Sequence, residues 1–497
     1  MKRKKKLEIA IILGLLLSQG MYGNAWAENL SGVDASNQDW QYNTDSEYVV
    51  SGVIKIGNGH TVEFGTKDGD NHVDNVTLKN GGDNYAVQAQ NGGGKLIINA
   101  NEAIIVTCDG NNAALTAGYD GTEYNLSAGA ISIAGNNGGS AILIGSSSAV
   151  NNKIDITAKG DADTKVDTIV NTLTSKSYSA TVNVSAGITN ITAEKGSNYI
   201  GNTYNYGKGL YITTGAAQIN VTAENGKNII ETGYNAVETN ADGATISLKA
   251  LSNEIKSTNS GAAGVYVNSS DDSKVIITAT GDYAEGYGYN KIVGGQTGVF
   301  VANSPKEEFS EVILEATGKN IISQTESSAI TMAAGVYVAH RGKLSMTARE
   351  NEITAVNEGV EGYLQSDITI TATDGNNVIN AERSGIMANM SYSDDDYMSN
   401  IKLIAENGDN IVQAGKDANN PFGIFARYNS EVTLQAQNNI IEAAAVDSNR
   451  YGSGIAIATG LGSGNFGNDT TVTLAAKEQN YLSGLVRAEA ATTVNLK

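Results

Sequence analysis

The feature that most constrains the fold is a short sequence pattern that recurs through most of the chain. Each copy has an alternating apolar segment that ends in Ala, a polar turn, an Asn followed by two apolar residues, and a Gly before another apolar alternation; residues 219–230 and 312–322 are two examples. The segment-ending alanines are Ala158, Ala193, Ala223, Ala250, Ala279, Ala316, Ala348, Ala372, Ala405, Ala436 and Ala475, with a mean spacing of about 32 residues. A period of this length that varies by a few residues predicts a solenoid with a constant core and loops of different length.

Each period has room for three short strands and contains no ten-residue segment with the 3.6-residue periodicity of a helix. Helical repeat arrays are therefore excluded, and the signatures of leucine-rich repeats and propellers are absent. The pattern predicts an all-β right-handed parallel β-helix of about 14 coils, in which each strand pairs with its copies in the neighbouring coils. The 2 prolines among 497 residues agree with this fold, because nearly every N–H of a central strand must donate to a neighbouring coil.

We expect Asn and Gly to form the corners between strands. An Asn such as Asn228 or Asn320 can take the left-handed backbone conformation of a sharp corner, and its amide can pair with the equivalent Asn one coil away. A Gly such as Gly264 or Gly298 can take the same conformation without a Cβ penalty. The Ala that ends each first strand is expected where the coil narrows.

The N-terminus has the pattern of a secretory signal peptide. Basic residues 2–6 precede the apolar run 9–17, and Ala25 and Ala27 are the small residues that a signal peptidase recognises, which predicts cleavage between Ala27 and Glu28. The apolar run is too short to span a bilayer. A buried N-terminal helix is the alternative. Cleavage would remove five basic residues and Glu8, and would change the formal net charge from −20 to −24.

This acidic balance argues against bulk attraction to nucleic acid or to anionic lipid. The single Cys108 cannot form an internal disulfide or a thiolate metal cage, and the apolar residues 104–106 before it predict a buried thiol.

We divide the chain into three parts: the signal peptide 1–27, an N-terminal cap and first coil 28–75, and a β-helix 76–497. Residues 28–50 are irregular and polar but include Trp40, Tyr42 and Tyr48, and a solenoid needs its first coil covered.

Together, the signal sequence, the acidic and cysteine-poor body and the long repeat with Asn and Gly corners resemble the β-helical passenger domain of a bacterial type V autotransporter adhesin. The resemblance covers residues 1–497 but concerns architecture only. Repeated sequences such as Gly-Lys-Asn-Ile-Ile at 226–230 and 318–322 are not a catalytic signature. It implies export, display at the cell surface of a Gram-negative-type bacterium or secretion, and an outer-membrane β-barrel translocator in the same polypeptide. The sequence ends at Lys497 without barrel strands, so that either a barrel follows beyond Lys497 or the passenger is anchored or released in another way.

A uniform repeat without a cluster of catalytic motifs, taken with this resemblance, predicts a binding or structural module that contacts a glycoprotein, a glycan or another copy of itself, with no enzymatic activity and no cofactor. The alternative is a polysaccharide lyase or glycoside hydrolase, because parallel β-helices also carry such enzymes. Residues 43–45 and 57–60 only superficially resemble two hydrolase motifs. The histidines His60, His72 and His340 are isolated, and the usual nucleophile and phosphate-binding motifs are absent.

Two acidic runs are weak candidates for binding Ca²⁺ through carboxylate oxygens. The first contains Asp271 and Asp272, and the second contains Asp394, Asp395 and Asp396. Both lie in Ser-rich loops, where a solvated turn is the simpler interpretation. Tyr392 and Tyr397 flank the second run and also make it a candidate contact patch.

Overall fold

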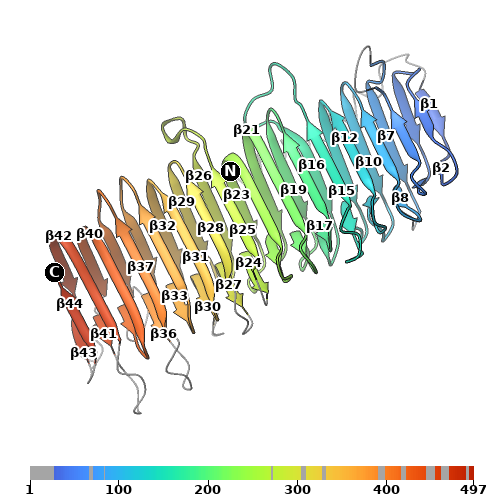
Figure 1. Ribbon diagram of the computed structural model, residues 1–497. Coiled ribbons are helices and arrows are strands. Elements are labelled where there is room, and N and C mark those ends of the chain that lie inside the picture. The colour runs from blue at the N-terminus through green and yellow to red at the C-terminus, as the bar shows by residue number, and fades with distance from the viewer. Residues whose placement is uncertain are drawn as a thin grey trace.

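The computed structural model describes residues 27–497 except for 67–70, 83, 270–271, 304–308, 327–331, 390–397, 416–420, 444–453, 460–469 and 489–491. Over these residues the chain winds into an elongated stack of strands, with the N-terminal coils (blue) at one end and the C-terminal coils (red) at the other (Figure 1). The strands of successive coils pair in parallel: β10 (Ala103–Cys108) pairs with β7 (Asn75–Asn80) and with β13 (Ala130–Gly135). The fold is the parallel β-helix that the sequence predicts.

Each coil contributes one strand to each of three faces. Face 1 comprises β1 (Ala27–Leu30), β4 (Glu47–Val50), β7, β10, β13, β16 (Ile169–Ser175), β19 (Ser197–Asn202), β26 (Tyr289–Gly294), β29 (Lys319–Gln324), β32 (Glu350–Ala355), β35 (Asn377–Ala381) and β38 (Asn410–Ala414). Face 2 comprises β2 (Val33–Ala35), β5 (Ile54–Ile56), β8 (Val87–Ala89), β11 (Leu115–Thr116), β14 (Ile142–Ile144), β17 (Ala180–Val184), β20 (Lys208–Ile212), β22 (Val237–Thr239), β24 (Ala263–Ser269), β27 (Thr297–Asn303), β30 (Ala334–Ala339), β33 (Glu358–Tyr363), β36 (Ser384–Asn389), β39 (Phe422–Ala426), β41 (Ile455–Thr459) and β43 (Leu485–Ala488). Face 3 comprises β3 (Trp40–Tyr42), β6 (Thr61–Phe64), β9 (Lys95–Asn99), β12 (Glu123–Ala128), β15 (Lys153–Ala158), β18 (Ile188–Ala193), β25 (Lys274–Ala279), β28 (Ser310–Ala316), β31 (Gly342–Ala348), β34 (Asp367–Ala372), β37 (Ser399–Ala405) and β44 (Thr493–Leu496).

Four long strands run from face 3 of one coil into face 1 of the next: β21 (Gln218–Thr232), β23 (Thr245–Ser257), β40 (Ser430–Ala443) and β42 (Thr471–Ser483). Faces 1 and 3 therefore form one continuous 28-stranded sheet, and face 2 is a separate 16-stranded sheet. A 3-10 helix, η1 (Tyr283–Glu285), lies in the loop between β25 and β26.

The 16 strands of face 2 define sixteen coils in the described part of the chain, two more than about 14. One of the two additional coils lies near the N-terminus, where the region expected to be a cap and one coil provides the six strands β1 to β6 of two coils. Its aromatic residues fill the first coils: Tyr48 and Phe64 are fully buried, and the rings of Tyr42 and Phe64 stack with centroids 4.8 Å apart.

The core follows from alternation along each strand. In β15, Ile154, Ile156 and Ala158 are buried while Lys153 is exposed, because successive side chains of a strand point to opposite faces of the sheet. The segment-ending alanines stack as expected: Ala158 pairs with Ala193, and Ala372, Ala405 and Ala436 form a buried cluster. The expected alignment is wrong by one residue at the last position: the pairing runs without interruption from Glu431 with Thr471 to Ala436 with Ala476, so that Ala475 pairs with Gln435.

The asparagines of the repeat form one continuous ladder inside face 1. Its members are Asn171, Asn198, Asn228, Asn253, Asn290, Asn320, Asn351, Asn377, Asn410, Asn439 and Asn480, and each Nδ2 donates to Oδ1 of the next over 2.8–3.0 Å. The predicted pairing of amides between coils is confirmed. The expected left-handed backbone is wrong for these asparagines, since none has a positive φ.

All bonds of the ladder point in the same direction along the chain. The second N–H of Asn228 donates to the backbone oxygen of Lys249, so that both donors of this amide are used. At the N-terminal end, Ile131 occupies the position that pairs with Asn171, and the buried Oδ1 of Asn171 has no partner. An aligned chain of amides leaves an unpaired acceptor at its first member.

The repeated glycines of face 2 are required by close approach and not by backbone conformation, which corrects our expectation that they form left-handed corners. A Cβ on Gly264 would lie 2.5 Å from Cγ2 of Ile292, and a Cβ on Gly298 would lie 2.3 Å from Cγ2 of Ile322. The same contact recurs between Gly335 and Ile353, Gly359 and Ile379, Gly385 and Val412, and Gly423 and Ile441. Each branched residue lies two positions after a ladder Asn, which explains why the two halves of the repeat occur together.

Candidate functional site

The outward side chains at the middle of the face 2 strands form a single column along the solenoid, which we call the face 2 column. Register connects Asp34, Lys55, Gln88, Thr116, Leu143, Asn183, Tyr211, Glu238, Tyr266, Phe300, Tyr337, Glu361, Met387, Phe425, Ala458 and Arg487. From Tyr211 to Phe425 every member is aromatic, Met or Glu. This stretch differs from an ordinary polar outer face and comprises three segments.

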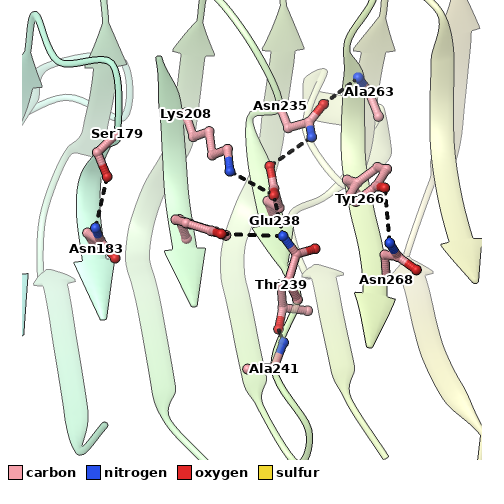
Figure 2. A network of polar contacts seen from close by, with 12 residues as sticks. Ser179, Asn183, Lys208, Asn235, Glu238, Thr239, Ala241, Ala263, Tyr266 and Asn268 are labelled. Carbon is pink, nitrogen blue, oxygen red and sulfur yellow. Dashed lines mark hydrogen bonds and ion pairs between the residues drawn. The ribbon is translucent and has the colours of Figure 1, made fainter. Parts of the chain in front are cut away.

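In the first segment, the buried carboxylate of Glu238 is fully paired. Lys208 Nζ lies 2.8 Å from its Oε1, and Asn240 Nδ2 donates to the same oxygen over 2.8 Å. Asn235 Nδ2 donates to Oε2, also over 2.8 Å. Figure 2 shows Lys208, from the preceding coil, and Asn235, from the same coil, directed toward Glu238. A buried charge is tolerated when it is both paired and hydrogen-bonded, as here.

Aromatic rings extend this network on both sides. Lys208 Nζ lies 3.6 Å from the centroid of the Tyr211 ring, and Asn240 Nδ2 donates to the Tyr211 hydroxyl over 3.3 Å. On the other side of Glu238, Asn268 Nδ2 donates to the Tyr266 hydroxyl over 3.3 Å (Figure 2). Burial and the charge of Glu238 raise the pKa of Tyr266 above its usual range. The network fixes several polar groups in place.

In the second segment, three aromatic rings stack along the solenoid axis. The centroids of Tyr266 and Phe300 are 4.5 Å apart with an interplanar angle of 9°, and those of Phe300 and Tyr337 are 5.3 Å apart at 11°. The rings cover each other's faces, and Tyr337 is only 4% exposed. This stack stabilises the sheet and offers little free ring surface to a ligand.

The third segment contains two neighbouring carboxyl groups. Glu358 Oε1 forms an ion pair with Arg383 Nη1 at 3.0 Å, and burial raises the pKa of Glu358. Burial and the charge of Glu358 raise the pKa of Glu361 to about 8, although Arg383 and Arg427 oppose the shift. Glu361 is half-buried between Tyr337 and Met387 of the column, and at neutral pH its carboxyl is largely protonated.

Beside the first segment, four tyrosines gather at the corner between faces 1 and 2. Tyr178, Tyr204, Tyr206 and Tyr234 come from the loops that precede β17, β20 and β22. Tyr178 is 72% exposed and Tyr206 is 52% exposed. Neighbouring ring centroids are 5.9–6.4 Å apart. We call this group the tyrosine cluster; it is the most exposed aromatic group that the described residues bring together.

The sequence-predicted site residues do not converge in the described part of the chain. Asp272 lies 3.5 Å from Lys274 Nζ, whereas Asp271, Asp394, Asp395 and Asp396 lie outside the described residues, as do Tyr392 and Tyr397. Among the described residues, no three His, Cys, Asp or Glu side chains are placed to hold a metal ion.

The other sequence candidates are also separate. His60 Nδ1 lies 3.2 Å from Asp39, and His340 packs edge-on against the ring of Tyr363. Cys108 is buried, as predicted. Ala27 and Glu28 pair with β4 at the start of β1, and residues 1–26 of the predicted signal peptide lie outside the described residues.

Sequence analysis missed the Glu238 network and the tyrosine cluster. Lys208 and Glu238 are separated by 30 residues, and only the register of β20 and β22 brings them together. One signal was present: the residue two positions after each repeat Gly is bulky in Tyr266, Phe300, Tyr337, Met387 and Phe425. In a strand whose neighbours on both sides point inward, that residue must point outward.

No known protein family, curated protein sequence or solved structure matches this chain. The described residues include no helix with the length and apolar character needed to span a bilayer.

Proposed function

We propose that this chain is an exported binding module that acts at the cell surface in the manner of an autotransporter adhesin passenger. The observation that carries the proposal is the tyrosine cluster, an exposed aromatic surface next to an ordered polar network on an otherwise regular rod. Tyrosine supplies large contact area with little loss of side-chain entropy, and it is enriched at binding surfaces. A long rod can hold such a surface away from the membrane that anchors it.

The route to the surface is part of the same proposal. The signal peptide 1–27 directs export, cleavage occurs between Ala27 and Glu28, and an outer-membrane β-barrel beyond Lys497 carries the passenger across the outer membrane. A single buried Cys108 suits a chain that must pass an oxidising compartment unfolded, because it contains no second cysteine for a disulfide. The partners are a glycoprotein, a glycan or a second copy of the chain.

A second candidate function, polysaccharide cleavage, is favoured by Glu358 and Glu361. Glycoside hydrolases use two carboxyl groups, one of which is kept protonated by a raised pKa. Glu361 has this property, with a pKa of about 8. We prefer the binding function because Glu358 is only 4% exposed and is held by Arg383, so that it is poorly placed to reach a substrate.

Both functions can be tested with the chain expressed from residue 28, since the sixteen described coils begin at residues 27–30. Beads coated with this protein should adhere to epithelial cells or to one another, and uncoated beads should not. The same protein should release no reducing ends or unsaturated uronides from a panel of polysaccharides. Cleavage without adhesion would replace the binding function with the enzymatic one.

A further inference from the structure

The ring faces of the tyrosine cluster are available to a ligand, unlike those of the stacked rings in the face 2 column. Tyr178 and Tyr204 meet at 64°, and Tyr206 is tilted by 45–54° from its three neighbours. Tyr266 and Phe300 are nearly parallel, at 9°. A tilted arrangement leaves part of each ring face uncovered, and the exposed fractions of Tyr178 and Tyr206 agree with this.

The loops that form the cluster are polar and contain almost no charged residues, and the nearby charges of Lys208 and Glu238 are paired with each other. The loops 176–179, 203–207, 233–236 and 258–261 contain Ser, Thr, Asn, Gly and Tyr, with one Lys, one Ala and no acidic residue. Asn259 Nδ2 donates to the backbone oxygen of Asn205, which ties the loops of two coils together. In a chain with a net charge of −20, this is a neutral region.

This composition selects the chemical class of the ligand. The negative chain repels acidic glycans over a Debye length, about 8–10 Å at physiological ionic strength. The loops contain no Leu, Ile, Val or Met, whereas the core of a protein interface is normally apolar. Aromatic faces beside amide and hydroxyl groups suit a sugar, whose C–H faces pack on rings and whose hydroxyls pair with polar groups.

We propose that the tyrosine cluster binds an uncharged oligosaccharide that lies across the corners of successive coils. This inference rests on the proposed binding function and assigns that function a ligand class and a site. The ring spacing of 5.9–6.4 Å is comparable with the length of one pyranose unit. Neighbouring sugars could therefore contact rings from neighbouring coils.

The test is an array that carries matched neutral, sialylated and sulfated oligosaccharides, probed with the chain expressed from residue 28. We expect binding to neutral members, and binding at least about tenfold weaker for the variant Tyr178→Ala/Tyr206→Ala, as for aromatic residues at the centre of other interfaces. The variant Tyr178→Phe/Tyr206→Phe keeps the ring faces and should retain most of the binding. Tyr119→Ala removes a tyrosine that is 49% exposed on another loop, and it should bind as the wild type does.

Each other outcome overturns the inference. Absence of binding to neutral glycans, or binding that the double Ala variant retains, would refute the ligand class or the site. Binding to an enzymatically deglycosylated glycoprotein through the same tyrosines would make the partner a protein. Failure of the inference is distinguished from failure of the proposed function by bead adhesion: adhesion without glycan binding contradicts only the inference, and loss of both contradicts both.

Discussion

The side-chain Nδ2 of Asn320 donates to Oδ1 of Asn351 over 3.0 Å, one coil further along the chain, and both side chains are buried. Asn320 Oδ1 in turn accepts from Asn290. An asparagine in the middle of the ladder thus donates to one neighbour and accepts from the other. Its removal leaves a buried donor on one side and a buried acceptor on the other.

Asn320→Ala should therefore lower the free energy of unfolding by about 2–4 kcal/mol, since each buried polar group left unpaired costs roughly 1–3 kcal/mol. Chemical denaturation followed by circular dichroism measures the change. Asn111→Ala, at an exposed asparagine, is the control and should change stability by less than about 0.5 kcal/mol. Equal effects of the two substitutions would show that the ladder adds no stability.

Gly335→Ala should also destabilise the protein, because the new Cβ would lie 2.5 Å from Cγ2 of Ile353 and 2.8 Å from the backbone oxygen of Gly359. Overpacking of this kind costs about 1–3 kcal/mol. At Gly118, whose added Cβ would meet no atom within 4 Å, the same substitution should be neutral or stabilise by up to about 1 kcal/mol. Thermal denaturation of the two variants gives the comparison, and a stable Gly335→Ala protein would contradict the close-approach explanation.

Lys208 and Glu238 should contribute far more than an exposed pair of the same type. Glu238→Ala removes the carboxylate to which Lys208, Asn235 and Asn240 donate, and breaking a buried ion pair costs about 3–5 kcal/mol. The Lys256–Glu231 pair has a similar distance, 2.7 Å, but both side chains are more than 40% exposed. Glu231→Ala should therefore cost no more than about 1 kcal/mol. Equal shifts of the denaturation midpoint in Glu238→Ala and Glu231→Ala would show that burial does not increase the contribution of the ion pair to stability.

Glu361 should make stability depend on pH. Because its folded-state pKa of about 8 lies above the value near 4.5 of a free Glu, the folded state holds this proton more tightly. The contribution to stability is complete below about pH 4.5 and is lost as the pH rises towards 8. The raised pKa of Glu358 acts in the same direction.

Glu361→Gln removes this titration, so that the variant should be more stable than the wild type at pH 9 and close to it at pH 4. Denaturation midpoints across this range provide the measurement. Glu224→Gln, at an exposed position, controls for the loss of one negative charge. A difference between Glu361→Gln and wild type that stays constant with pH would argue against a protonated Glu361.

The sequence alone predicts the architecture because the constraint is local and repeated. Ile154 and Ile156 alternate with polar residues in one strand, and an Asn such as Asn228 recurs once per coil. The role of Gly264 could not be predicted in the same way, because close approach and a left-handed backbone select the same residue. The backbone conformation of Gly264 and its contact with Ile292, both of which require the structure, distinguish them.

The candidate site was less predictable because it depends on loop length. Tyr178 and Tyr206 come from two different loops, and Lys208 meets Glu238 only after one full coil. Because the segment-ending alanines are 24–39 residues apart, the sequence separation between contacting residues of neighbouring coils varies, and such contacts cannot be predicted from a fixed spacing. The sequence shows which residue of each repeat points outward, but it does not show which residue of the neighbouring coil contacts it.

The one-way direction of the asparagine ladder has a consequence for the evolution of the rod. A segment copied from Asn320 to residue 350 carries one ladder asparagine, which donates to the next coil and accepts from the preceding one. It also carries Gly335, whose branched contact residue, Ile353, belongs to the following segment. Gene duplication could insert such a segment at any step between Asn171 and Asn480 without leaving a buried amide unpaired. An unequal crossover would therefore lengthen or shorten the rod by whole coils, and selection could adjust its reach without redesigning its core.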